Sequence, residues 1–356
     1  MELEMNSKED LWYDALVRKD SSFEGQFFVG VKTTGIFCRP GCTARKPKKL
    51  NTEFFTNVKD ALDHGYRPCK ICDPLKPLGA VPNWLAPLMK ELEIHPQQKL
   101  KDQDLRNLEL EPERVRRWFK QHHGLTFQAY QRSLRINQAF GQIKKGEKVI
   151  SSAYDHGYES LSGFGDSFKK IVGESPRSSM DKEIIHIQRI PSPLGPLLLG
   201  ATEKGICLLE FTDRKMLETQ LERLKKYYNS VPLPGSNHHM ELLRSELLEY
   251  FKGERKAFSV SLDLRGSTFQ VSVWKILQQI PYGRTRSYKE QAIALGNLKS
   301  IRAVARANGD NRISIVIPCH RVIGGDGKLV GYGGGLWRKQ WLLNLESSRK
   351  QLKLDL

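Results

Sequence analysis

Four of the six cysteines in this 356-residue chain lie within its first 72 residues, as two close pairs. The pairs are Cys38-x3-Cys42 and Cys69-x2-Cys72, and the prolines and glycine around them favour tight turns. Two turns that each present two thiolates supply the tetrahedral four-sulfur set that zinc takes in proteins. The pattern therefore predicts one zinc ion bound by these four cysteines. Its simplest role is a structural staple for a small N-terminal domain.

A fifth cysteine lies in a different context, the string IPCHRV at residues 317–322. The apolar run 313–317 predicts a short buried strand, and Pro318 prevents further ladder pairing. Cys319 is then expected where a strand ends, with the imidazole of His320 beside it. A thiol is a strong nucleophile only as the thiolate, which a nearby base or cation favours. The residues alone leave two interpretations open, a reactive nucleophile or a small buried hydrophobe.

The charge of the chain favours a nucleic-acid partner. The formal net charge is +17, and residues 265–356 contribute +11 of it through sixteen basic and five acidic side chains. No apolar run reaches the ~18 residues of a membrane span. The N-terminus opens with acidic residues and does not read as a secretory signal. Because unevenly spaced cysteines also suit a reducing compartment, we expect a cytoplasmic protein without membrane contact.

Residues from about 84 to 180 have the apolar spacing of helices. Pro112 suits the first turn of a helix in a first helix–turn–helix unit, and a long helix is expected over 127–144. In a second unit, Gly157 ends one helix and Ser160 caps the next. The two helices of that unit are expected over residues 149–156 and 161–172. The bare pattern fits both a DNA-binding domain and a structural helical bundle.

Residues 182–264 are predicted to form a small α/β unit. Strands are expected over 184–190 and 206–211, and helices over 217–228 and 240–251. Cys207 lies within the second apolar strand, where an inert core position is the favoured interpretation.

The string at residues 317–322 resembles the active-site motif of the O6-alkylguanine-DNA alkyltransferases. Further strings match that family, among them FQxxVW from residue 269, IPYG from residue 280 and GYGGG from residue 331. The resemblance implies a ribonuclease-H-like α/β subdomain at 182–264. It also implies a mostly helical active-site and DNA-binding domain, with its own helix–turn–helix, at 265–350.

This resemblance assigns catalytic roles to five residues. Cys319 takes the alkyl group, and His320 accepts the thiol proton through a bridging water while Glu346 orients the imidazole. Tyr288 protonates or hydrogen-bonds the leaving guanine oxygen, and Asn311 braces the turn. The product is a stable thioether, so each protein molecule is expected to react once at this site.

The resemblance also assigns DNA contacts. Arg302 lies on the helix that enters the minor groove and takes the place of the flipped-out base. Tyr332 lines the base pocket, and Gly333 belongs to a glycine-rich loop that can approach a flat base closely. Leu298 departs from the proline that family members often have before this helix. That difference is expected to alter the loop and spare the chemistry.

The strings FCRPxC from residue 37 and RPCKxC from residue 67 resemble the N-terminal domain of the Ada family of adaptive-response proteins. In that family the first zinc cysteine also accepts methyl groups from DNA phosphotriesters, which assigns this role to Cys38. Four thiolates around one divalent ion leave a net negative charge. Methylation removes part of that charge, lowers repulsion from DNA phosphates and can switch on DNA binding. Thr34, Arg45 and Arg67 match positions that contact the DNA backbone.

The string from residue 153 to residue 176 resembles the second half of AraC-type DNA-binding domains, which set two recognition helices into successive major grooves. The resemblance implies an AraC-type double helix–turn–helix domain at 84–180. The first unit departs more from the pattern. Glu109, Glu111 and Glu113 crowd its second helix, where carboxylates repel phosphates.

The resemblance to the Ada family covers roughly residues 8–348 in one module order, with the zinc domain at 8–78. The expected fold class is multidomain α+β. The expected function is a suicidal repair methyltransferase that accepts methyl from O6-methylguanine, and from O4-methylthymine, on Cys319. Cys38, bound to zinc, is expected to accept methyl from DNA methylphosphotriesters and so switch the protein into a transcriptional regulator of the alkylation response. The expected partners of the monomeric chain are alkylated and promoter double-stranded DNA and RNA polymerase.

The sequence leaves two alternatives open. The chain can be a DNA-binding transcription regulator whose alkyltransferase domain is inactive. It can also be a thiol hydrolase, since Cys-His-Glu triads serve acyl transfer too. Turnover on an ester substrate separates the second alternative from a one-shot methyl acceptor.

Overall fold

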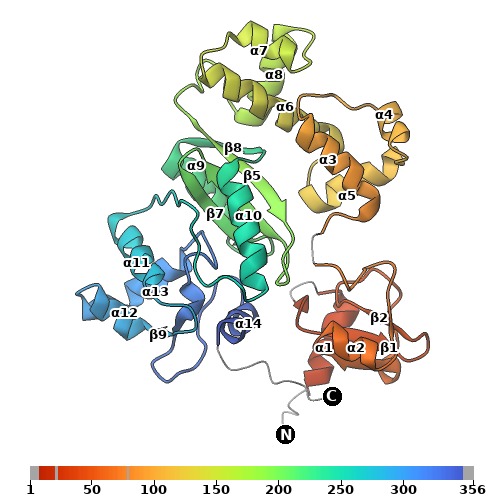
Figure 1. Cartoon of the computed structure of the whole chain (residues 1–356), viewed down its shortest axis with the longest axis vertical. Helices are drawn as coiled ribbons and strands as arrows, with labels where there is room; N and C mark the ends of the chain where they lie inside the picture. Colours follow the sequence, from red (N-terminus) through yellow and green to blue (C-terminus); the bar gives the residue numbers. More distant parts are fainter. Residues whose placement is uncertain (1–7, 21–22, 78–79, 348–356) are drawn as a thin grey trace, which may run out of the picture. The chain divides into compact units, whose positions relative to one another are not determined.

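The computed structural model describes residues 8–20, 23–77 and 80–347 (Figure 1). The chain forms two compact units. One contains the residues up to Ala80 together with Pro191–Leu197, and the other contains Val81–Ile190 and the residues from Leu198 onward. Within the described residues, no helix combines the length and the apolar character that crossing a membrane requires.

The N-terminal unit contains a four-stranded sheet in the order β3-β1-β2-β4. Its elements are α1 (Lys8–Arg18), β1 (Phe28–Val31), β2 (Ile36–Cys38), the 3-10 turn η2 (Lys49–Asn51), β3 (Thr52–Phe55), α2 (Val58–Asp63) and β4 (Arg67–Pro68). Strand β1 is antiparallel to β2 and β3, while β4 runs parallel to β2. Gly30 in β1 has to be a glycine, because a Cβ there would lie 2.8 Å from the Tyr66 ring. Trp12 of α1 stacks on Phe27 with ring centroids 5.0 Å apart, which anchors the helix to this sheet domain.

Residues 83–172 are helical, as predicted. The elements are the 3-10 turn η3 (Asn83–Leu85), α3 (Ala86–Ile94), α4 (Asp102–Asn107), α5 (Pro112–His123), α6 (Phe127–Lys144), α7 (Val149–Asp155) and α8 (Leu161–Val172). Helix α6 joins two cores, because its first turn packs in the core around Phe119 and its last turns pack around Phe168. The predicted caps are confirmed: Gly157 has φ +71, and Ser160 Oγ accepts from the Gly163 amide at 3.1 Å.

The α/β unit has a four-stranded sheet in the order β7-β6-β5-β8, with β8 parallel to β5. Its elements are β5 (Glu183–Ile190), β6 (Leu197–Thr202), β7 (Gly205–Phe211), α9 (Leu217–Tyr228), β8 (Ser230–Pro234) and α10 (His238–Phe251). Figure 1 shows α10 crossing one face of this sheet. Every residue of β7 is buried. Cys207 is among them, and burial raises the pKa of its thiol, as expected of a core cysteine.

The C-terminal part is mostly helical. Its elements are α11 (Thr268–Gln278), β9 (Arg286–Ser287), α12 (Tyr288–Ala294), η4 (Leu298–Ser300), α13 (Ile301–Gly309), η5 (Cys319–Arg321), β10 (Val322–Ile323) and α14 (Leu336–Glu346). Strands β9 and β10 pair in parallel. The mostly helical character expected of this domain is therefore confirmed.

The strand predicted over residues 313–317 is wrong. Ile313 forms an isolated bridge to Leu209, and the residues after it fold into a tight turn. Ile315 in this turn has φ +72, a left-handed conformation that strains a β-branched residue and ends any ladder. The run is buried, as its apolar composition predicts, but it is buried as a turn.

Candidate functional sites

Cys319 is the first residue of η5 and is 8 % exposed. The side chain of Asn311 holds it, because Nδ2 donates to Cys319 Sγ at 3.2 Å and to the Ile317 carbonyl at 2.9 Å. Its Oδ1 accepts from the Ile313 amide at 2.9 Å, so Asn311 spans the strained turn. Burial raises the pKa of the Cys319 thiol, and the bond from Asn311 opposes this only in part. The resting sulfur is therefore a neutral thiol that needs a base.

The candidate for that base is His320, the next residue in the chain. Its Nε2 lies 2.9 Å from Oε1 of Glu346, and both side chains are buried. Its Nδ1 is buried and has no hydrogen-bond partner among the described residues. Burial lowers the pKa of His320, although Glu346 partly offsets it. The imidazole is therefore neutral near pH 7, with its proton directed at Glu346 and Nδ1 available as a base.

Glu346 is the centre of a buried charge cluster. It accepts from Arg321 Nε at 2.7 Å and Nη2 at 2.8 Å, and from the Tyr250 hydroxyl at 2.7 Å. Burial alone would raise the pKa of Glu346, but its bonds to His320 and Arg321 hold that pKa well below the usual range. Glu346 is thus a carboxylate that can stabilise a protonated His320.

Two predicted tyrosines lie in the surroundings of Cys319. Burial raises the pKa of Tyr288 and of Tyr332, and a charged Cys319 raises both further. The Tyr332 hydroxyl is buried and has no partner within the described residues. The Tyr288 hydroxyl donates to the Val330 carbonyl at 3.4 Å, where the glycine-rich loop begins. Both phenols are therefore protonated at neutral pH and can act as hydrogen-bond donors.

Two of the predicted DNA contacts of this domain, Arg302 and Gly333, lie at its surface. Arg302 is exposed in the first turn of α13. Gly333 is exposed in the loop between β10 and α14, and a Cβ on it would lie 2.6 Å from Cζ of Arg214. The loop backbone is thus packed too closely for a larger residue. Leu298, the departure noted in the sequence, is half exposed in η4 and makes no contact with Cys319 that the structure shows.

The four N-terminal cysteines converge as predicted. Their sulfur atoms all lie within 4.8 Å of one another, and those of Cys42 and Cys69 are 4.0 Å apart. Zn–S bonds of about 2.3 Å in a tetrahedron separate sulfur atoms by about 3.8 Å, so the four residues fit one zinc ion. The hydrogen bond between Cys38 and Cys42 raises the pKa of Cys38 and lowers that of Cys42. Thiols this close cannot all ionise without a cation between them, and zinc supplies one.

Arg39 joins the two cysteine turns. Its backbone amide donates to Cys72 Sγ at 3.4 Å, and its guanidinium donates to the Pro74 carbonyl at 3.2 Å. The three residues of the zinc domain that are predicted to contact DNA are exposed. Thr34 and Arg67 lie near each other, because the Arg67 amide donates to the carbonyl of Gly35 at 2.7 Å. Arg45 is exposed on the segment after Cys42.

The acidic crowding expected in the first helix–turn–helix unit is partly neutralised. Arg116 of α5 forms ion pairs with Asp102, at 2.6 Å, and with Glu113. Glu109 lies in the turn before α5 with φ +59, and Glu111 is the N-cap residue of that helix. One of the three carboxylates is therefore paired with a cation of the same helix.

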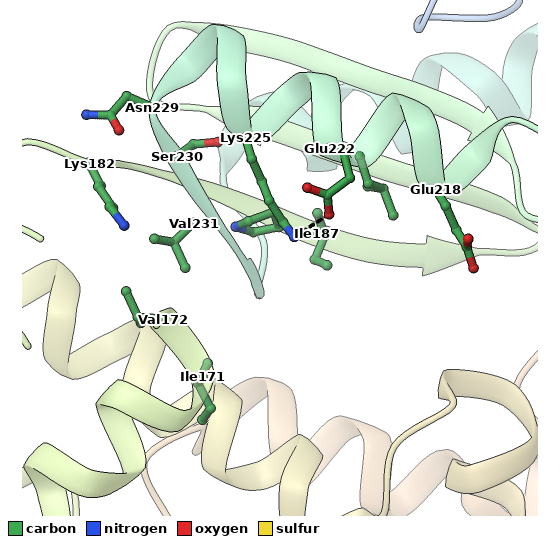
Figure 2. Close-up of a pocket in the computed structure, with 12 residues that line it drawn as sticks. Ile171, Val172, Lys182, Ile187, Glu218, Glu222, Lys225, Asn229, Ser230 and Val231 are labelled. Atoms are coloured by element: carbon green, nitrogen blue, oxygen red, sulfur yellow. Dashed lines mark hydrogen bonds and ion pairs between the residues drawn. The ribbon is translucent and has the colours of Figure 1, made fainter. Parts of the chain in front are cut away.

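A hollow of about 620 Å³ lies between α8 and the α/β unit (Figure 2). Ile171 and Val172 line one side of it, and residues of β5, α9 and β8 line the other. Its two lysines are paired, Lys182 with Glu174 at 2.9 Å and Lys225 with Glu222 at 2.6 Å. It contains none of the predicted site residues and is therefore no candidate for methyl transfer.

Sequence reasoning missed several buried charges around Cys319. Lys339 of α14 is fully buried, and its Nζ donates to the carbonyls of Val322 at 2.5 Å and Val330 at 2.6 Å. Glu210 and Arg214 form a buried ion pair that also contacts the turn before Cys319. The one signal in the sequence was a carboxylate, Glu210, inside an otherwise apolar strand.

Four family models match the chain, in one order from end to end. They are the metal binding domain of Ada at residues 12–74, a helix-turn-helix domain at 105–181, and the ribonuclease-like and DNA binding domains of 6-O-methylguanine DNA methyltransferase at 185–264 and 268–348. The expected fold class is thereby confirmed.

Relatives match over the same modules. The bifunctional transcriptional activator/DNA repair enzyme Ada of Escherichia coli is 32% identical over 355 residues, covering 96% of this chain and 98% of that protein. A methylated-DNA–protein-cysteine methyltransferase of Mycobacterium bovis is 47% identical over 173 residues, 49% of this chain and 99% of that protein. The crystal structure of Mycobacterium tuberculosis OGT in complex with DNA is 44% identical and covers 46% of this chain and 94% of that one, with a TM-score of 0.40. Because similarity extends over nearly the whole length of a bifunctional relative, this chain belongs to the Ada family of transcriptional regulators and methylated-DNA–protein-cysteine methyltransferases.

Proposed function

We propose that the chain repairs O6-methylguanine, and O4-methylthymine, by moving the methyl group to Cys319. The observation that carries this proposal is the buried set of Cys319, Asn311, His320 and Glu346. It supplies a nucleophile, a brace for its turn, a base with a free nitrogen and a carboxylate that stabilises the protonated base.

The proposed reaction begins with proton transfer from Cys319 through a bridging water to Nδ1 of His320. Glu346, whose pKa lies well below the usual range, stabilises the imidazolium that forms. The thiolate then attacks the methyl carbon in line with the bond to guanine O6. The S–C bond forms as the C–O bond breaks, the electron pair goes to the guanine, and Tyr288 donates a proton there. The resulting thioether is uncharged and stable, so the site reacts once.

We infer a second acceptor at Cys38. Zinc keeps this sulfur as a thiolate, so no separate base is needed. The side chains of Thr34, Arg45 and Arg67 are exposed, which supports the proposal that they contact DNA phosphates. Methylation of Cys38 reduces the negative charge of the site and so strengthens promoter binding, which makes the zinc module the damage sensor of a transcriptional regulator. We further propose that the protein acts in the cytoplasm as a monomer and contacts RNA polymerase.

Mass spectrometry of the intact protein tests both acceptors. DNA with O6-methylguanine should add one methyl group at Cys319, and DNA with methylphosphotriesters should add one at Cys38. Cys319→Ala should abolish the first addition and leave the second, while Cys38→Ala should do the reverse. If a methyl group is still gained from O6-methylguanine in Cys319→Ala, the acceptor is misassigned. Multiple turnovers on a methyl donor or an ester would favour the hydrolase alternative, and no transfer to Cys319 would favour a pure regulator.

A further inference from the structure

The end of strand β7 reaches from the α/β unit to the surroundings of Cys319. Residues 210–214, here the bracing segment, contain a buried ion pair between Arg214 Nη1 and Glu210 Oε2. Glu210 is 0 % exposed and Arg214 is 8 % exposed. A buried ion pair is unfavourable unless further hydrogen bonds satisfy both partners. In this chain, those further bonds are made to the turn that carries the nucleophile.

Arg214 binds the backbone at and just before Asn311. Its Nη1 donates to the Asn311 carbonyl at 3.1 Å, and its Nη2 donates to the carbonyl of Gly309. The Asn311 side chain in turn donates to Cys319 Sγ at 3.2 Å. The planar guanidinium can serve these acceptors and Glu210 at once, which a lysine ammonium on a flexible stem cannot match.

Glu210 holds the strained part of the same turn. Its Oε1 accepts from Ser314 Oγ at 3.1 Å, and the Ser314 amide donates to the Leu209 carbonyl at 2.8 Å. The next residue is Ile315, with φ +72. Such a conformation persists only where the surroundings hold it in place, and strain of this kind clusters at functional sites. Glu210 and the end of β7 supply that support.

The other side of the bracing segment holds the glycine-rich loop. Asp213 forms a bidentate ion pair with Arg338, at 3.0 and 2.8 Å, and Arg338 Nη1 also donates to the Gly334 carbonyl at 2.9 Å. A Cβ on Gly334 would lie 2.7 Å from the Phe211 ring, so the loop is packed directly on the segment. One segment therefore contacts both the nucleophile turn and the loop beside the base pocket.

We propose that the bracing segment is a positioning element that sets the geometry between Cys319 and the base held by the glycine-rich loop. The inference rests on the proposed methyl transfer at Cys319. Glu210 and Arg214 are positioning residues, because they act through Ser314 and Asn311 rather than on the methyl group. A misplacement of about 1 Å can slow a reaction about 10²-fold even when no reacting atom is removed.

The test is Arg214→Lys in the full-length protein, which keeps the charge that neutralises Glu210. Single-turnover transfer from DNA containing O6-methylguanine gives a rate constant at saturating DNA and a methyl stoichiometry. We expect the rate constant to fall about 10- to 100-fold while the stoichiometry stays at one methyl group per Cys319. The dissociation constant for unmethylated DNA, measured with Cys319→Ser added, should stay within about twofold of the Cys319→Ser parent, because Arg214 lies outside the proposed DNA contacts.

Arg255→Lys is the matched control. Arg255 pairs with the buried Glu246 at 3.1 Å in the same α/β unit and makes no contact with the Cys319 turn that the structure shows. Its rate constant and stoichiometry should match the parent protein. A merely structural role of Arg214 would lower the stoichiometry and leave the rate constant of the reactive fraction unchanged. That outcome, or a rate constant like that of Arg255→Lys, overturns the inference.

Asp213→Asn tests the loop side with a residue that is partly exposed, so the fold should tolerate it. Weakening its bond to Arg338 should slow transfer a few-fold at full stoichiometry, and an unchanged rate constant would remove the loop from the proposal. If the parent protein itself transfers no methyl group to Cys319, it is the proposed function that fails. The parent measurement thus distinguishes the two failures.

Discussion

Replacing Glu346 with glutamine tests the charge cluster that orients His320. An amide has one acceptor oxygen and adds an NH₂ donor, so it cannot accept from His320, Arg321 and Tyr250 as the carboxylate does. Arg321, which is buried, would keep its charge without a counter-ion. Removing one partner of a buried ion pair costs about 3–5 kcal/mol. We expect the free energy of unfolding around α14 to fall by that amount.

The same substitution should slow methyl transfer to Cys319. His320 would lose the carboxylate that fixes its tautomer and stabilises its protonated form. Loss of positioned general-base catalysis costs about 10²–10⁴-fold in rate. We expect a decrease within that range in single-turnover transfer from O6-methylguanine DNA.

Adding Arg321→Met to Glu346→Gln separates stability from chemistry. With the unpaired cation removed, most of the lost stability should return, whereas the rate should stay low because His320 still lacks its carboxylate. Hydrogen exchange of peptides from α14, read by mass spectrometry, measures the free energy of opening. A decrease of less than about 1 kcal/mol for Glu346→Gln alone, the usual effect of one uncharged hydrogen bond, would contradict a buried ion pair between Glu346 and Arg321. Recovery of the parent rate in the double variant would contradict the role of Glu346 in orienting His320.

Three further outcomes are expected. Cys69→Ala should reduce bound zinc from one equivalent and unfold the N-terminal sheet domain, whereas Cys207→Ala should leave the zinc content unchanged, as metal analysis with circular dichroism can show. Ser160→Ala removes the bond to the Gly163 amide and should destabilise α8 by about 0.5–2 kcal/mol, measured by hydrogen exchange of that helix. Burial lowers the pKa of His320, so the unfolded chain binds the proton more readily, and stability should decline as pH falls below about 6.5. The transfer rate depends on His320 in the folded chain, so it should decline only at a lower pH than stability does. Glu346 adds to the stability loss below about 4.5, and a urea midpoint that rises on acidification would contradict both assignments.

The helices were predictable from sequence wherever local chemistry marks their ends. Helix α6 has the predicted bounds, Phe127–Lys144, and Thr126 caps it by accepting from the Ala129 amide. In the second helix–turn–helix unit, Gly157 marks the end of α7 and Ser160 caps the start of α8. These signals lie within a few residues of the structure they determine. The zinc site was equally predictable, because only certain spacings of cysteines allow four sulfur atoms to bind one ion in a tetrahedron.

The turn before Cys319 was not predictable in that way. Its apolar run indicates a buried strand, and only the left-handed Ile315 and the bonds from Leu209 and Glu210 make it a turn. Those partners lie about a hundred residues earlier in the chain, on a strand that is apolar except for the carboxylate of Glu210. Long-range hydrogen bonds override local strand preference here, since β propensity depends strongly on tertiary context. The role of Arg214 was not predictable for the same reason, because the Asn311 carbonyl that it contacts is also distant in the sequence.

The two proposed acceptors obtain a reactive thiolate in different ways. At Cys319 burial raises the pKa of the thiol, so the sulfur becomes a nucleophile only when His320 takes its proton. At Cys38 the neighbouring thiols raise the pKa in the same direction, and a cation rather than a base is needed to keep the sulfur ionised. A buried thiol that needs a proton acceptor can react selectively with a nucleobase that is flipped into its pocket. A thiolate held by a metal near exposed basic side chains is permanently ready, as a sensor of damage on the DNA backbone has to be.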